Sequence, residues 1–153
     1  MRKAFDGVLN ILLLPLIIVA GFMAILAVVF YRISLYLLVW NCWCPRGRNV
    51  LLVYSNSPRW QDDICETVIP HLPGSATILN WSRRRAWKWY HLSVLVAWHF
   101  GGRREFNPIV VVFRPFQRAR IFRFWSAYRD QKHGKPEKLV SLKKEMFNTI
   151  SRY

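Results

Sequence analysis

A run of 23 residues without a charged side chain, from Val8 to Phe30, constrains this chain more than any other feature. Asn10 is its one clearly polar member. As a helix the run would extend for about 35 Å, enough to cross a hydrocarbon core about 30 Å thick. Pro15 lies inside it, and membrane-spanning helices tolerate proline. We therefore predict a transmembrane anchor over residues 1–31.

A cleaved signal peptide is the alternative interpretation of the same run. Met1, Arg2 and Lys3 provide the positively charged start that such a peptide needs. The apolar part is longer than usual for a signal peptide, however, and no cleavage site with the A-x-A pattern follows it. Both observations favour an anchor that is retained.

A second apolar stretch, ISLYLLVWNCWC, follows Arg32 and is too short to cross the membrane again. The amphipathic rings of Tyr36, Trp40 and Trp43 favour the level of the lipid headgroups. We therefore predict that residues 32–45 are a juxtamembrane segment that continues the helix along the interface. A shallow re-entrant hairpin is the weaker alternative.

The distribution of charge predicts on which side of the membrane the rest of the chain lies. The formal net charge is +15, of which residues 1–31 carry +1 and the remainder +14. Arg32, Arg46 and Arg48 flank the C-terminal end of the run. Because short basic flanks tend to stay inside, this small difference predicts a cytoplasmic C-terminal part.

The three cysteines agree with a reducing compartment, since they provide no disulfide framework. Cys42 and Cys44 flank Trp43 without a second pair of ligands, so we expect no metal site there, and we expect no cofactor. S-acylation of this pair is one interpretation, and simple buried or interfacial thiols are the favoured one.

Short apolar runs alternate with helical patterns from residue 46 onwards. Helical connections between strands predict that the first three strands are parallel. The short connection 114–120 instead predicts that the third and fourth strands form an antiparallel hairpin. The sequence thus predicts an α/β fold: an N-terminal transmembrane helix followed by a small layered α/β domain over residues 46–153. The predicted order is β-α-β-α-β-β-α, with a mixed, mostly parallel sheet. Its strands are expected at 49–54, 76–81, 108–113 and 121–125, and its helices at 58–72, 83–100 and 136–150.

The three predicted helices do not all arrange their apolar residues in the same way. Helix 58–72 has one ridge and helix 136–150 one apolar side, so each should cover the sheet with one face. Helix 83–100 is apolar nearly all round, which predicts burial or packing on lipid or a partner. The two patterned faces consist of Trp60, Ile64, Val68 and Leu72, and of Leu139, Leu142, Met146 and Ile150.

Polar and basic residues follow each of the first three predicted strands. In open α/β sheets, ligands bind outside the carboxyl ends of the parallel strands, so these loops should lie together. We therefore predict a site for an anion, such as a phosphorylated ligand, at this edge. Its candidate residues are Ser55, Asn56, Ser57, Arg59, Ser82, Arg83, Arg84, Arg85 and Arg114.

Arg83, Arg84 and Arg85 are the most informative of these candidates. In the first turn of a helix they oppose the positive end of its dipole, and a bound anion would offset that cost. The alternative is that Ser57 and Ser82 are ordinary caps and the arginines face solvent or an anionic membrane surface. The absence of a P-loop or a G-x-G-x-x-G motif favours this alternative.

Other motifs do not indicate catalysis. The sequence has neither H-E-x-x-H nor G-x-S-x-G, and nothing places an acidic residue beside a nucleophile, so no catalytic residue is assigned. His91 and His99 share a face of an apolar helix and are expected to be structural. Gly101 and Gly102 are expected to end that helix rather than to form an anion-binding nest with the two arginines that follow.

Three kinds of partner suit so basic a chain. Aromatic and basic residues alternate in 83–91 and 118–125, as in single-strand binding proteins, but no nucleic-acid signature is present. For an anchored chain the lipid bilayer, with its anionic headgroups, is the nearer polyanion. We therefore expect a binding or interaction module at the cytoplasmic membrane face, with anionic lipid headgroups as its main partner and a protein as an alternative partner. The alternative is a phosphorylated-ligand-binding or transferase-like half-domain.

Overall fold

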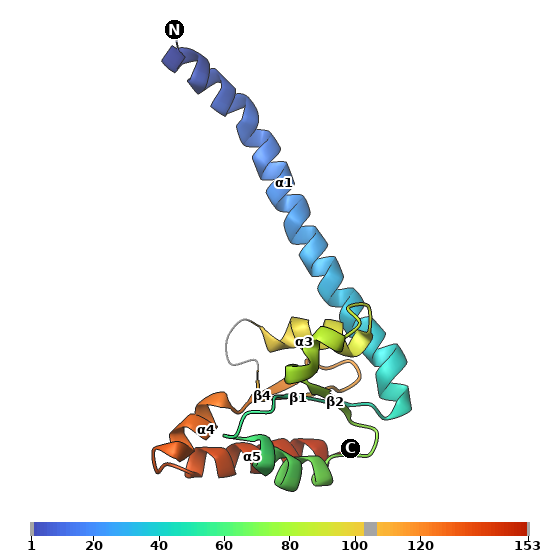
Figure 1. The fold of residues 1–153 in the computed structure, drawn as a ribbon. Helices are drawn as coiled ribbons and strands as arrows, with labels where there is room; N and C mark the ends of the chain where they lie inside the picture. Colours follow the sequence, from blue (N-terminus) through green and yellow to red (C-terminus); the bar gives the residue numbers. More distant parts are fainter. Residues whose placement is uncertain (1, 103–106, 153) are drawn as a thin grey trace. The chain divides into compact units, whose positions relative to one another are not determined.

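The computed structural model describes residues 2–102 and 107–152, with side chains from residue 14 onwards (Figure 1). It divides into two compact units, Met1–Leu37 and Leu38–Tyr153, each of which is described by itself.

The predicted apolar helix is present as α1 (Arg2–Leu38), 37 residues long with Pro15 inside it. The chain then continues as a π-helical turn, η1 (Val39–Trp43), and a 3-10 turn, η2 (Cys44–Arg46). Among the described residues one helix, Leu14–Arg46, is long and apolar enough to cross a membrane. A signal sequence near the N-terminus would have the same properties, so length and composition alone do not separate the two.

Four strands form one mixed sheet in the order β2-β1-β3-β4. They are β1 (Val50–Tyr54), β2 (Thr77–Asn80), β3 (Ile109–Val112) and β4 (Arg120–Arg123). β1 and β2 are parallel, and β3 and β4 form the predicted antiparallel hairpin. The prediction of a mostly parallel sheet is wrong, because β3 runs antiparallel to β1.

The register explains this difference. Asn80, at the end of β2, pairs with Tyr54, and Ile109, at the start of β3, pairs with Val53. The connection between β2 and β3 therefore begins and ends at the same edge of the sheet. A parallel β3 would have required a connection that returned the chain to the opposite edge.

The predicted helix 83–100 is wrong as a single element. It is divided into a 3-10 segment, η5 (Trp81–Ala86), and a helix, α3 (Leu92–Gly101), and the residues between them are not helical. Trp81 makes edge contacts with both Trp87 and Trp98, at centroid distances of 5.6 and 5.2 Å. These contacts require the chain to fold back after η5, which one straight helix does not allow. Gly102, at φ +70°, provides the expected glycine at the end of α3.

The remaining helices lie together on the opposite side of the sheet from α3 (Figure 1). They are the segment α2 (Gln61–Asp63), η3 (Ile64–Val68) and η4 (Ile69–His71), then α4 (Trp125–Lys132) and α5 (Glu137–Ile150). α5 matches its prediction closely. α4 was not predicted, because just two of its residues after Trp125, Ala127 and Tyr128, are apolar, and a strand was expected up to residue 125.

Alternate residues of the central strands point to the two faces of the sheet, and both faces are buried. Val50, Leu52, Val110 and Val112 pack with η3, α4 and α5 in one cluster that includes the predicted ridge residues Trp60, Ile64 and Val68. On the other face, Phe113 makes edge contacts with Phe100 of α3 and with Trp43 of η1. The domain is thus broadly α/β, with helices on both sides of a small mixed sheet (Figure 1).

Burial of Trp43 corrects its predicted place at the lipid headgroups. Its side chain is 5% exposed, and Val39 of the same turn is fully buried. The core of the folded domain therefore includes residues that precede the predicted boundary at residue 46.

Candidate functional site

The structure brings two of the predicted loops together at the carboxyl ends of β1 and β2. The backbone N–H of Asn56 donates to Oγ of Ser82 at 3.0 Å. Asn80 joins the same cluster, since its Nδ2 donates to Oδ1 of Asn56 at 2.6 Å and its Oδ1 accepts from the N–H of Ser82 at 2.9 Å. The polar groups of these loops therefore bond to one another, and Asn80 rather than Ser82 caps η5.

The serines of the first loop also have partners within the protein. Oγ of Ser55 accepts from the indole N–H of Trp60 at 3.3 Å, and Oγ of Ser57 lies 3.5 Å from the backbone N–H of Arg59. The carbonyl of Ser57 accepts from the N–H groups of Trp60 and Gln61. Ser57 thus begins the helical segment through its backbone, and the predicted side-chain cap is not formed.

The three arginines at 83–85 do not occupy the first turn of a long helix. They lie in η5, which is six residues long and is kinked at Arg83. So short a segment has little accumulated dipole, and the predicted conflict between the arginines and a helix N-terminus does not arise. All three side chains are exposed, and the guanidinium of Arg84 lies over the ring of Trp81, 5.4 Å from its centroid.

Arg114 lies at the opposite edge of the sheet from the other candidates. It follows β3, whose last residue, Val112, pairs with Val50 at the start of β1. Its guanidinium is 3.5 Å from the carbonyl oxygen of Thr149, near the end of α5. The antiparallel direction of β3 is therefore the reason why the nine predicted residues do not form one site.

The charged residues of the domain are distributed unevenly between the two sides of the sheet, and this distribution identifies a second candidate surface. We call residues 38–48 and 81–102 the α3 layer, because they pack on the Phe113 face of the sheet or against α3. The described acidic residues of the domain all lie in the opposite helical layer, at Asp62, Asp63, Glu66, Asp130, Glu137 and Glu145. The α3 layer has no acidic residue and six cations, Arg46, Arg48, Arg83, Arg84, Arg85 and Lys88.

The same layer exposes large aromatic side chains. Trp89 is 79% exposed, Trp98 58% and Tyr90 57%. The opposite helical layer exposes one large apolar side chain among its described residues, Val140. Exposed aromatic rings beside unopposed cations are typical of surfaces that contact the membrane interface.

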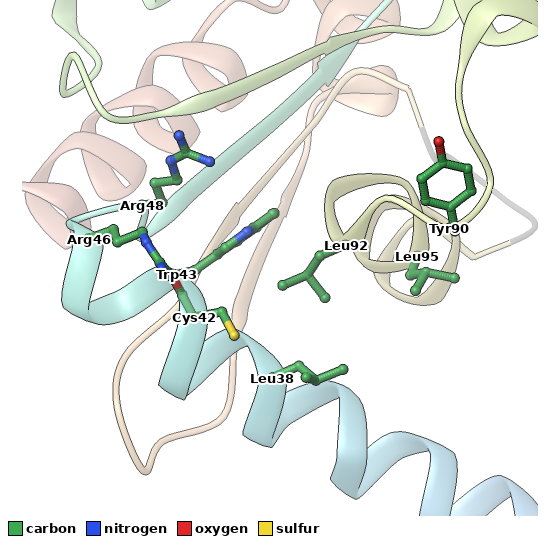
Figure 2. Close-up of a pocket in the computed structure, with 8 residues that line it drawn as sticks. All are labelled: Leu38, Cys42, Trp43, Arg46, Arg48, Tyr90, Leu92 and Leu95. Atoms are coloured by element: carbon green, nitrogen blue, oxygen red, sulfur yellow. The ribbon is translucent and has the colours of Figure 1, made fainter.

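A groove of about 460 Å³ opens within the α3 layer (Figure 2). Leu38, Cys42 and Trp43 project from the helical segment on one side, and Leu92 and Leu95 project from α3 on the other. Arg46, Arg48 and Tyr90 complete its lining. We call this cavity the juxtamembrane groove, because its first lining residue directly follows the last residue of the unit Met1–Leu37. It combines apolar walls with two cations and no carboxylate.

A tight turn at Gly47 places the two arginines of the groove. Gly47 adopts φ +69°, and its N–H donates to the carbonyl of Cys44 at 3.0 Å. The hydroxyl of Ser75 donates to the carbonyl of Gly47 at 2.6 Å and so holds the turn from the neighbouring segment. The guanidinium of Arg46 folds back to donate to the carbonyl of Cys42. Both arginines therefore lie at the same end of the groove.

The polar network around Asp63 was not predicted from the sequence. Nζ of Lys143 lies 2.7 Å from both carboxylate oxygens and 2.8 Å from Oγ1 of Thr67, and the hydroxyl of Tyr128 donates to the same carboxylate. Partial burial alone would raise the pKa of Asp63, but the bonds from Lys143, Tyr128 and Thr67 outweigh it and lower the pKa. Burial and the adjacent carboxylate raise the pKa of Tyr128. The network joins α2, α4 and α5, and we assign it a structural role.

The two remaining expectations concern an anion-binding nest after α3 and a metal site. Arg103 and Arg104, the basic part of the alternative nest, lie outside the described residues. Within residues 14–102 and 107–152, no three side chains of His, Cys, Asp or Glu gather as metal ligands would.

Comparison of the chain with family models, curated proteins and solved structures found no match.

Proposed function

We propose that this chain is a single-pass membrane protein whose folded domain is a binding module for the anionic lipid surface on the cytoplasmic side. The single observation that carries the proposal is the asymmetry of the two helical layers. Cations and exposed aromatic rings occur without a carboxylate in the α3 layer, whereas the acidic residues that the structure describes in the domain all lie in the other layer.

The physical basis is the attraction between clustered cations and anionic headgroups. Each basic side chain near such a surface contributes about 1 kcal/mol, and the attraction falls off within a Debye length of about 10 Å at 0.1 M salt. Exposed Trp and Tyr add affinity because their rings favour the headgroup region. A layer with both features and no acidic residue avoids the repulsion that the opposite layer would experience.

The position of the folded domain directly after the apolar helix in the chain supports the same proposal. Leu38 begins the folded domain immediately after an apolar helix compatible with membrane anchoring. Arg46 and Arg48 follow within ten residues and belong to the α3 layer, so basic residues occur where the chain would leave the bilayer. The tendency of basic flanks to stay inside supports the cytoplasmic side for this domain.

Hydrogen exchange on the full chain in nanodiscs tests the proposal. With anionic lipid present, the amides of residues 81–102 should exchange at least threefold more slowly than in purely zwitterionic discs, and higher salt should reverse the effect. The amides of α5 serve as an internal reference and should not change.

Two variants with equal loss of charge sharpen this experiment. Arg83→Gln/Arg84→Gln/Arg85→Gln should abolish the protection by anionic lipid. Lys132→Gln/Lys135→Gln/Lys144→Gln removes three exposed cations from the opposite layer and should preserve it. Equal effects of the two variants would mean that net charge, and not the α3 layer, determines membrane contact.

The alternative function, recognition of a phosphorylated ligand at the β1 and β2 loops, has weaker support. Asn56, Asn80 and Ser82 bond to one another, and Arg114 lies at the other edge of the sheet.

A further inference from the structure

The juxtamembrane groove differs from the rest of the α3 layer in being concave and amphipathic. We propose that it binds one anionic glycerophospholipid, with the phosphate at Arg46 and Arg48 and hydrocarbon against Leu38, Leu92 and Leu95. This inference rests on the proposed function, since it names a specific lipid site within the surface assigned to the membrane.

The lining of the groove changes from apolar to basic along its length, as the polarity of a phospholipid does. Leu38 is the last residue of the apolar helix α1, and Arg46 lies eight residues farther on, about 12 Å along a helical path. Figure 2 shows the leucines facing the space from both walls and the arginines at one end of it. A phospholipid has the same order, from hydrocarbon through glycerol to phosphate.

The charged end of the groove suits a phosphate. Guanidinium groups form forked hydrogen bonds with phosphate oxygens, and no carboxylate lines the cavity to compete for them. The Gly47 turn and its bond from Ser75 hold Arg46 and Arg48 close together in the chain and in space. The backbone that carries the two arginines is thus held in place before a ligand arrives, which reduces the entropic cost of binding.

The apolar walls distinguish a lipid from a free phosphate compound. Inorganic phosphate would leave the apolar side chains of the groove exposed to water, whereas hydrocarbon would cover them. These side chains are Leu38, Leu92 and Leu95. A volume of about 460 Å³ is within the range of ligand pockets and accommodates a glycerophosphate group with the first carbons of its chains. The remaining hydrocarbon would extend into the bilayer.

Cys42 provides a direct probe, because its thiol is free and lines the groove. In the full chain with Cys44→Ser and Cys65→Ser, Cys42 is the one remaining cysteine. The rate of its alkylation by a maleimide is measured in nonionic detergent. Dihexanoyl phosphatidylglycerol is compared with dihexanoyl phosphatidylcholine, which has the same chains, and with glycerol 3-phosphate, which has none.

Phosphatidylglycerol should slow alkylation at least threefold in a saturable manner, and the other two compounds should leave the rate nearly unchanged. Arg46→Gln/Arg48→Gln should remove this effect, and Arg46→Lys/Arg48→Lys should keep most of it. Each variant is compared with its own rate without lipid, since Arg46 bonds to the carbonyl of Cys42. Equal slowing by both lipids, slowing by glycerol 3-phosphate alone, or no slowing at all would overturn the proposal.

One variant separates this inference from the proposed function. Arg83→Gln/Arg84→Gln/Arg85→Gln lies outside the groove and should retain slowing by phosphatidylglycerol while it loses the hydrogen-exchange protection by anionic bilayers. Loss of both effects in this variant would mean that the groove has no binding of its own, which also overturns the inference.

Discussion

The ring of Trp43 meets the ring of Phe113 edge to face, with their centroids 6.0 Å apart, on the side of the sheet that α3 covers. Trp43 comes five residues after the end of α1, so the folded domain uses the residues just beyond the apolar helix as part of its core. This relationship has a direct consequence for stability.

Replacing Trp43 with Ala should destabilise the domain by about 3–5 kcal/mol, because a nearly buried indole is lost and a cavity remains. Trp89→Ala is the matched control, since Trp89 is 79% exposed and its loss should change stability little. Denaturant titration of both variants, followed by tryptophan fluorescence, measures the difference. Similar stabilities of the two variants would mean that Trp43 does not belong to the core.

Replacing Gly47 with Ala should cost about 1 kcal/mol, because the turn that places Arg46 and Arg48 requires φ +69°. A Cβ there would lie 3.5 Å from Oγ of Ser75, an ordinary contact, so the cost is conformational rather than steric. Gly74→Ala is the control, since its Cβ would meet nothing within 4 Å. A shift of the midpoint of thermal unfolding in the first variant alone supports the turn.

The Asp63–Lys143 pair should make stability depend on acidity. The pKa of Asp63 is lowered in the folded state, below an ordinary value of 3.8, so the stabilisation is complete well above that pH and is lost as the pH falls through the folded pKa. Asp63→Asn should therefore flatten the fall in unfolding temperature between about pH 5 and pH 3.

At neutral pH the same variant should lose about 1 kcal/mol, a modest amount because a third of the Asp63 side chain is exposed. Asp130→Asn, which breaks a pair with the half-exposed Lys138, is the control and should change the unfolding temperature little. An unchanged pH profile in Asp63→Asn would show that the network has no energetic role.

Retention of the apolar helix is a separate expectation. Intact mass of the protein isolated from membranes should include residues 1–37, because the anchor interpretation requires that they are not removed. A protease added to sealed cells should leave the C-terminal domain uncleaved until the cells are permeabilised. A mature chain that begins near residue 30 would instead identify the helix as a signal sequence.

Sequence patterns predicted the elements whose burial is regular. Continuous apolar runs marked β1 and β3, which are covered on both faces, and the periodic apolar side of 136–150 marked α5. The hairpin of β3 and β4 followed from the length of its connection. These features depend on local composition and spacing, which a sequence shows directly.

Features that depend on tertiary contacts were not predictable in the same way. The antiparallel pairing of β3 with β1 depends on contacts between distant strands, and the break in helix 83–100 accompanies contacts of Trp81 with Trp87 and Trp98. An amphipathic ring such as Trp43 suits either a membrane interface or a protein core, and its burial decides between them. The groove combines segments that are more than forty residues apart, so no local motif indicates it.

The most direct measurement of membrane contact by the α3 layer uses one fluorescent label at a time on a chain whose three cysteines are replaced by Ser. Labels at Lys88→Cys, in the α3 layer, and at Lys144→Cys, in α5, occupy exposed positions on opposite layers. The full chain is placed in bilayers that contain anionic lipid and a quencher attached to the headgroups. We predict at least threefold stronger quenching at position 88 than at position 144. Equal quenching, or stronger quenching at position 144, would show that the α3 layer does not face the membrane.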